Sequence, residues 1–147
     1  MKAGNPEKYR GLEMSEAAAN LLKSDPKKFA SYCNGVGSRI GFWNNLAYHF
    51  IPNTIWFMDI TPASDIHDVE YSVPDSFSFL GLAKQAFDAA NMRIYRNIQT
   101  LIKRKSSGGI LYRMRMRRAD LYYYALCSDL AEESFMSGKT IEGKAHK

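Results

Sequence analysis

The strongest constraint on the fold is a helical pattern of apolar side chains in the second half of the chain. Apolar residues recur every three or four positions, as on one face of an α-helix, at positions 80, 83, 87, 90, 94, 98 and 101. The pattern predicts a helix that opens at Pro74–Asp75 and continues to about Lys103. Residues 106–109, Ser-Ser-Gly-Gly, predict a turn, and a last long helix is expected from about Ile110 to Phe135, ended by Ser137–Gly138. Two long helices joined by a short turn should pack antiparallel.

Shorter helices are predicted ahead of this pair. Ser15 and Asp25–Pro26 are capping signals for helices at 16–23 and 26–32, and Thr61–Pro62 opens a helix that reaches about Ser72. The two glycines within residues 33–38 predict a loop, and the aromatic-rich residues 40–58 predict an irregular segment packed on the core. A short hairpin within 40–60 is the only strand structure expected. We therefore expect an all-α domain over residues 14–136, with a flexible leader at 1–13 and a flexible tail at 137–147.

The size and composition indicate one domain. The chain has 147 residues, of which 46% are hydrophobic, enough to bury a core. No apolar run approaches the roughly 20 residues that span a bilayer, and residues 1–10 lack the apolar segment of a secretory signal. Cys33 and Cys127 are too few for a disulfide framework. These features predict a cytoplasmic protein with reduced thiols, with secretion by another route and one long-range disulfide as the alternatives.

The positive charge is concentrated in one stretch. Nine of the 20 Lys and Arg residues lie between Arg93 and Arg118, where no acid occurs, so the other 11 face all 15 Asp and Glu. The nine are Arg93, Arg96, Lys103, Arg104, Lys105, Arg113, Arg115, Arg117 and Arg118. The tip of a helical hairpin would bring them together and favour a polyanionic partner. We expect an anionic phospholipid surface, with nucleic acid as the less favoured alternative.

The best candidate for chemistry is the pair His67–Asp68. On the helix predicted at 61–72, Ala63, His67 and Tyr71 are four residues apart and share one face, while Asp68 points about 100° away from His67. A neutral histidine can act as a general base near neutral pH. A carboxylate beside it can bind a hard cation.

The motif His67-Asp68-x-x-Tyr71, with Cys33-Asn-Gly-Val-Gly37 upstream and a long acid-bearing helix downstream, resembles the phospholipase A2 superfamily. The closest likeness is to its short, disulfide-poor microbial and phage-type members, and it covers roughly residues 32–95. The resemblance implies a phospholipase A2-like fold and a calcium-dependent lipid ester hydrolase. In such an enzyme His67 would activate the water that attacks the ester carbonyl.

The resemblance also implies the other site residues. Asp68 and the backbone carbonyls of Cys33, Gly35 and Gly37 would bind Ca²⁺, which would stabilise the oxyanion. Tyr71 would contribute a supporting hydroxyl.

An acid on the following helix would orient His67, and two residues compete for this role. Asp88 has the appropriate chemistry, whereas the register suggested by Asn91–Met92 favours Gln85.

Several features depart from the family pattern. Ser64 and Glu70 stand where cysteines often occur, and 29 residues lie between Gly37 and His67. A member that has lost activity is therefore one alternative.

Two other function classes remain open. A metal-dependent HD-type phosphohydrolase would use His49, His67, Asp68 and Asp120. A non-enzymatic basic module would bind nucleic acid or an anionic membrane.

Overall fold

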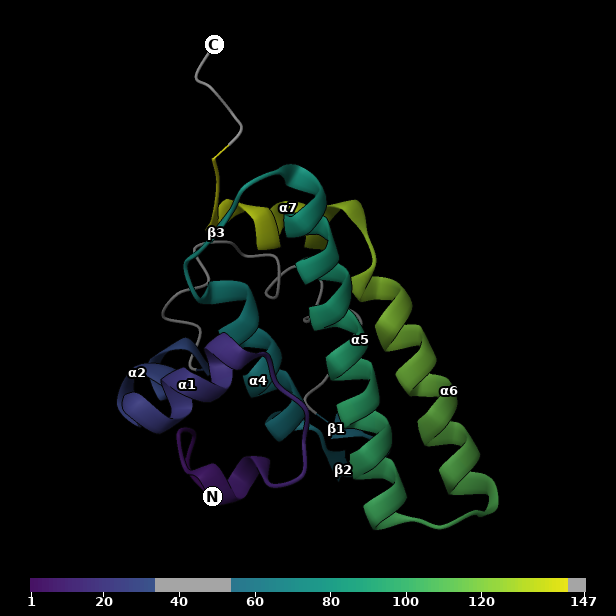
Figure 1. The fold of residues 1–147 in the computed structure, drawn as a ribbon. Helices are drawn as coiled ribbons and strands as arrows, with labels where there is room; N and C mark the ends of the chain where they lie inside the picture. Colours follow the sequence, from purple (N-terminus) through teal and green to yellow (C-terminus); the bar gives the residue numbers. More distant parts are fainter. Residues whose placement is uncertain (34–53, 143–147) are drawn as a thin grey trace.

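The computed structural model describes residues 1–33 and 54–142 and shows a mostly helical chain (Figure 1). In chain order the elements are η1 (Pro6–Tyr9), α1 (Glu16–Ser24), α2 (Pro26–Cys33), β1 (Thr54–Ile55), β2 (Met58–Asp59), α4 (Thr61–Ser72), β3 (Asp75–Phe77), α5 (Leu80–Lys105), α6 (Gly109–Leu126), α7 (Asp129–Ser137) and β4 (Lys139–Ile141). Helices dominate as predicted, and two small sheets accompany them.

The helical hairpin predicted from the apolar pattern is present as α5 and α6. Both helices run along one side of the molecule and are joined by the short turn after Lys105 (Figure 1). The predicted start at Pro74–Asp75 is wrong, because Asp75–Phe77 forms β3 and α5 begins only at Leu80. Phe79 occupies the N-cap in an extended conformation, so the chain leaves the strand before it turns into the helix.

The single long helix predicted at 110–135 is divided in two. α6 ends at Leu126, and α7 begins at Asp129 after the extended residue Ser128. The Ser128 hydroxyl accepts a hydrogen bond from the Ala131 amide at 3.4 Å, and Asp129 lies in the first turn, where a negative charge is favourable. A capping serine therefore restarts the helix inside an otherwise helical stretch.

The short helices follow their predicted caps. Ser15 Oγ accepts from the Ala18 amide at 3.3 Å, and Asp25 Oδ1 accepts from the Lys28 amide at 3.0 Å. α4 begins at Thr61 as expected, but Ile60 is its N-cap and Thr61 is already helical. The Thr61 amide donates to Asp59 Oδ1 at 2.8 Å, so an aspartate two residues upstream holds the start of α4.

The described residues also contain two small two-stranded sheets. β1 and β2 form the short antiparallel hairpin expected before residue 60, with Trp56 and Phe57 as its two-residue turn. β3 and β4 pair in parallel, so Asp75 lies opposite Lys139. The expectation of a flexible tail from 137 is wrong for the residues that form β4.

α4 lies at the centre of the fold and contributes to three hydrophobic clusters. Ala63 packs with the β1–β2 hairpin, α5 and α6. Ile66 and Val69 pack with η1, α1 and α2. Tyr71 packs with α5 and α7. Because α4 is covered on several sides, seven of its twelve residues are buried, including Asp65, His67 and Glu70.

The N-terminal residues are packed against α4 and α5, in contrast to the flexible leader expected at 1–13. Lys8 Nζ lies 2.6 Å from Asp65 Oδ2, and the Tyr9 hydroxyl donates to the same oxygen at 2.9 Å. The Glu13 main chain forms two hydrogen bonds with the Asn97 side-chain amide of α5, both 2.7 Å long. The partners lie more than 50 residues away, so a local reading of residues 1–13 could not find them.

The buried Lys8–Asp65 pair should matter more than an exposed pair. We expect Lys8→Met to lower the free energy of unfolding by about 3–5 kcal/mol, because it leaves the Asp65 carboxylate buried without its counter-charge. The matched control is Arg10→Met, which breaks the exposed Arg10–Glu7 pair and should cost less than about 1 kcal/mol. Urea unfolding of the two variants measures both values, and equal effects would contradict an anchoring role for the N-terminal segment.

Candidate functional site

His67 lies in the middle of α4 and its side chain is buried, with 1% of the residue exposed. Its Nε2 atom lies 3.1 Å from Oδ1 of Asn91, a buried residue of α5. The Tyr71 hydroxyl, one turn further along α4, donates to the same Asn91 oxygen at 2.7 Å. The His67 and Tyr71 rings also contact each other, with centroids 4.1 Å apart. Two side chains of α4 thus converge on one amide oxygen of α5.

The third bond of Asn91 determines how its amide is oriented. Nδ2 donates to the backbone carbonyl of Leu126 at 2.9 Å. A carbonyl can only accept, so the amide NH₂ must face Leu126 and Oδ1 must face His67 and Tyr71. An acceptor at Nε2 fixes the neutral tautomer of His67 with its proton on Nε2 and a lone pair on Nδ1. The network therefore prepares Nδ1 as the basic atom of the ring.

Burial keeps this histidine neutral. It lowers the pKa of His67 from its usual 6.5 to about 4, although the hydrogen bond that His67 makes to Asn91 raises it and the Arg93 charge lowers it further. Burial likewise raises the pKa of the Tyr71 hydroxyl, so it stays a proton donor. Both groups are in the protonation states that the shared bonds to Asn91 require.

Asp68 is half-buried next to His67, and it differs from its neighbours on α4. Within residues 1–33 and 54–142 its carboxylate forms no hydrogen bond or ion pair, whereas Asp65 and Glu70 are both paired. Burial, followed by repulsion from Asp65, raises the pKa of Asp68 to about 8. Such a carboxylate would gain from a nearby cation.

Cys33, the first residue of the predicted calcium loop, lies against α4. Its Sγ is 3.4 Å from the Phe29 carbonyl and 3.8 Å from the Asp65 carbonyl. Burial, with the charges of Asp65 and Asp68, raises the pKa of this thiol to about 12. Cys33 therefore lies beside Asp65 in the first half of α4. Gly35 and Gly37 lie outside the described residues.

Neither predicted orienting residue is at His67. Gln85 and Asp88 are both exposed on α5, and Asn91 forms the bond to the histidine. Asn91 follows Phe87 by four positions and precedes Ile94 by three, so it lies on the buried stripe of the helix. A polar residue within an apolar stripe is the sequence signal that distinguishes Asn91 from Gln85 and Asp88.

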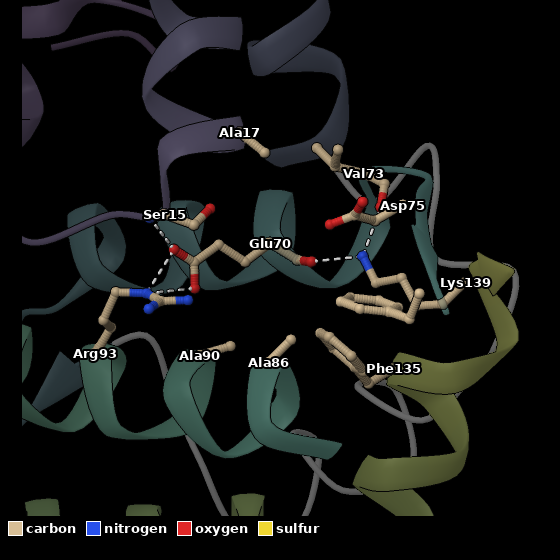
Figure 2. Close-up of a pocket in the computed structure, with 11 residues that line it drawn as sticks. Ser15, Ala17, Glu70, Val73, Asp75, Ala86, Ala90, Arg93, Phe135 and Lys139 are labelled. Atoms are coloured by element: carbon tan, nitrogen blue, oxygen red, sulfur yellow. Dashed lines mark hydrogen bonds and ion pairs between the residues drawn. The ribbon is translucent and has the colours of Figure 1, made fainter. Parts of the chain in front are cut away.

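Glu70 and Arg93 form a second polar contact between α4 and α5, shown in Figure 2. Arg93 Nε lies 2.9 Å from Glu70 Oε1, which also accepts from the Ser15 amide at 2.5 Å. The pair borders a small cavity of about 50 Å³ that Phe135 and Lys139 also line. Lys139 Nζ donates to the Glu70 and Val73 carbonyls at 2.9 and 2.5 Å, and lies over the Phe135 ring. These contacts give the carbonyl groups at the end of α4 a hydrogen-bond donor, and we assign them a structural role.

Within the described residues, the side chains that a metal site of the HD type would need do not come together. Asp120 of α6 accepts a hydrogen bond from the Tyr95 hydroxyl at 2.6 Å, and His49 lies outside the described residues. Within the described ranges, no group of three or more His, Cys, Asp or Glu side chains could hold a metal ion. Both cysteines, Cys33 and Cys127, are free thiols.

The chain matches no protein-family model, no curated protein and no solved structure. In residues 1–33 and 54–142, none of the helices is long and apolar enough to cross a membrane.

Replacing Asn91 should separate its role from those of Gln85 and Asp88. Asn91→Leu leaves the Tyr71 hydroxyl, the His67 Nε2–H and the Leu126 carbonyl unpaired in the core, and each such group costs about 1–3 kcal/mol. We expect a loss of at least about 3 kcal/mol in urea unfolding. Gln85→Ala and Asp88→Ala, on the exposed face of the same helix, should change stability by less than about 0.5 kcal/mol. A small effect of Asn91→Leu would contradict the network.

The pKa of His67 predicts a pH dependence of stability. Because the folded pKa of about 4 lies below the unfolded value of 6.5, the unfolded chain binds the extra proton between these pH values. The His67 contribution is therefore fully present above pH 6.5 and falls by about 1.4 kcal/mol per pH unit as the pH drops toward 4. His67→Gln should lack this component. The difference between the two proteins in unfolding free energy, measured from pH 7 to pH 4.5, isolates it from the carboxylates, and a constant difference would contradict the assignment.

Proposed function

We propose that this protein is a phospholipase A2-like, calcium-dependent lipid ester hydrolase in which His67 is the general base. The observation that carries the proposal is the convergence of His67 Nε2 and the Tyr71 hydroxyl on one side-chain oxygen of the next helix. The resemblance inferred from the motif requires such an acceptor for the histidine. Asn91 supplies this acceptor, in place of Asp88 or Gln85, which the sequence had suggested for the role.

The protein residues would act through Nδ1 of His67. The Asn91 oxygen holds the proton on Nε2, so the lone pair on Nδ1 can accept a proton from a water molecule that attacks an ester carbonyl. Tyr71 keeps Asn91 in place through its own bond to Oδ1. Since His67 is 1% exposed, the ester reaches Nδ1 only after the surrounding chain opens.

The donor chemistry near His67 is compatible with calcium. Asp68 offers a half-buried carboxylate that no described residue neutralises, and carboxylate and carbonyl oxygens are the ligands that Ca²⁺ prefers. The carbonyls of Cys33, Gly35 and Gly37 would complete the ligand set in this proposal. When bound, the cation would polarise the ester carbonyl and stabilise the oxyanion. The specific prediction for this chain is that Asp68 is its carboxylate ligand.

Asn91 is an amide where the resemblance implies an acid. An amide fixes the tautomer of His67, but it stabilises the imidazolium less than a carboxylate would, so the base is weak. We therefore propose a slow enzyme, and Asn91→Asp should raise the pKa of His67 and the hydrolysis rate. An inactive relative is the alternative reading, and the experiment below decides between them.

Fatty acid release from vesicles tests the proposal. We expect release with calcium and none with chelator, and His67→Ala should lower the rate by about 10²–10⁴, the usual value of a positioned general base. Asp68→Asn should abolish the calcium-dependent release, because it removes the proposed carboxylate ligand. The control is Asp88→Asn, an exposed acid on α5 that should leave the rate unchanged.

Two results would contradict the assignment. Hydrolysis that persists in chelator and in His67→Ala would place the activity elsewhere, and no hydrolysis by either the wild type or Asn91→Asp would favour the inactive reading. Phosphatase activity with Mn²⁺ or Fe²⁺ that His49→Ala abolishes would replace the proposal with the HD-type alternative.

A further inference from the structure

The turn of the β1–β2 hairpin presents two aromatic side chains to solvent. Trp56 is 45% exposed and Phe57 is 93% exposed, and both have left-handed backbone angles, with φ of 44° and 63°. A two-residue hairpin turn with positive φ at both positions is the type I′ turn, which strongly favours Asn-Gly. Bulky aromatic residues are costly in this conformation. Neither the backbone conformation of the turn nor packing in the core therefore explains why two aromatic residues occupy it.

One buried arginine connects this turn to the end of the helical hairpin. Arg115 of α6 donates from Nη2 to the Trp56 carbonyl at 3.0 Å, and from Nη1 to Ser106 Oγ at 3.3 Å. Ser106 is the residue that follows α5. The aromatic turn is therefore held beside the α5–α6 connection, at the end of the molecule where that connection lies (Figure 1).

Exposed cations and further apolar side chains surround this end. The prediction that all nine basic residues of 93–118 gather there is wrong, because Arg93 pairs with Glu70, Arg96 pairs with Glu13 and Arg115 is buried. Five basic residues of the stretch are exposed in the last turn of α5 and the first half of α6: Lys103, Arg104, Lys105, Arg113 and Arg117. Ile110 and Leu111, in the first turn of α6, are also exposed.

We propose that Trp56 and Phe57, with Ile110 and Leu111, form a membrane-docking tip that inserts into an anionic phospholipid surface. Cations around an apolar centre match a lipid interface, where the charges meet head groups and the apolar groups enter the acyl boundary. Nucleic acid would use the cations and could stack on the aromatic rings, but it offers nothing to the aliphatic pair Ile110 and Leu111. The opposite end of α5 lies roughly 40 Å away for 26 residues at the usual rise, and α7, which packs against α5, carries the exposed acids Asp129 and Glu133. The charge distribution therefore favours docking through the tip end.

The docking tip adds a binding surface to the proposed function. It rests on that function only in taking the phospholipid surface to be the substrate surface. The test uses the full chain in chelator, where hydrolysis plays no part, and measures sedimentation with phosphatidylcholine vesicles that contain about 30% phosphatidylglycerol. We expect binding at low salt, weaker binding at about 300 mM salt because exposed charges are screened, and little binding to pure phosphatidylcholine.

The decisive variant is Trp56→Asn/Phe57→Gly. It should lower vesicle affinity at least about tenfold, because the inserting apolar surface is lost. Its melting temperature should stay the same or rise, because Asn-Gly suits a type I′ turn better than Trp-Phe does. The matched control is Phe79→Asn, which removes an exposed aromatic at the N-cap of α5, at the acidic end, and should leave binding unchanged. Arg113→Gln/Arg117→Gln should weaken binding mainly at low salt.

The outcomes separate the two proposals. Unchanged vesicle affinity of the Trp56→Asn/Phe57→Gly variant would overturn the docking tip, as would an equal loss in Phe79→Asn. Binding of a DNA or RNA duplex in gel shift with no vesicle binding would also overturn it. Vesicle binding that depends on the tip in a protein without hydrolytic activity would support the tip and contradict the proposed function.

Discussion

The structure depends on how α4 buries its polar side chains. Asp65, His67 and Glu70 all enter the interior, where an unpaired polar or charged group is costly. Each is held by a different part of the chain: Asp65 by the N-terminal segment, His67 by Asn91 of α5, and Glu70 by Arg93 of α5 and the Ser15 amide. Lys139 of β4 then binds carbonyls at the end of α4. The elements around α4 are thus fixed by the groups they must satisfy, as well as by apolar packing.

Asn91 shows how one side chain joins three helices. Its oxygen receives bonds from His67 and Tyr71 of α4, and its NH₂ donates to the carbonyl of Leu126, the last residue of α6. The last carbonyls of a helix have no partner within the helix, so this bond satisfies one of them inside the core. The end of α6, where the sequence predicts no interruption, is therefore stabilised by the same residue that orients the histidine. The candidate site and the packing of α4, α5 and α6 share one hydrogen-bond network.

The parts of the fold that were predictable from the sequence carry local signals. Ser15 and Asp25–Pro26 mark their helices through caps, and the apolar spacing from 83 onward marks α5. β3 and β4 are three residues each and pair across more than 60 positions, so no periodicity announces them. The packing of residues 1–13 depends on distant partners in α4 and α5. At the site, the shared helix face of His67 and Tyr71 is predictable from their spacing. The role of Asn91 is not predictable from the family pattern, which implies an acid, because here an amide on the buried stripe of α5 accepts the bond from His67.

The proposed docking tip and the proposed base are close in the chain, which gives the two proposals a physical connection. Phe57 is followed by β2, and Asp59 then accepts hydrogen bonds from the amide and hydroxyl of Thr61, the first residue of α4. Ile55, Met58 and Ile60 are buried against α5 and α6, so the hairpin is packed firmly behind its exposed turn. A force on Trp56 and Phe57 at a lipid surface would therefore act on the N-terminal end of α4, within two helical turns of His67. The buried hairpin residues and the Asp59–Thr61 contacts are therefore the physical link between the two proposals.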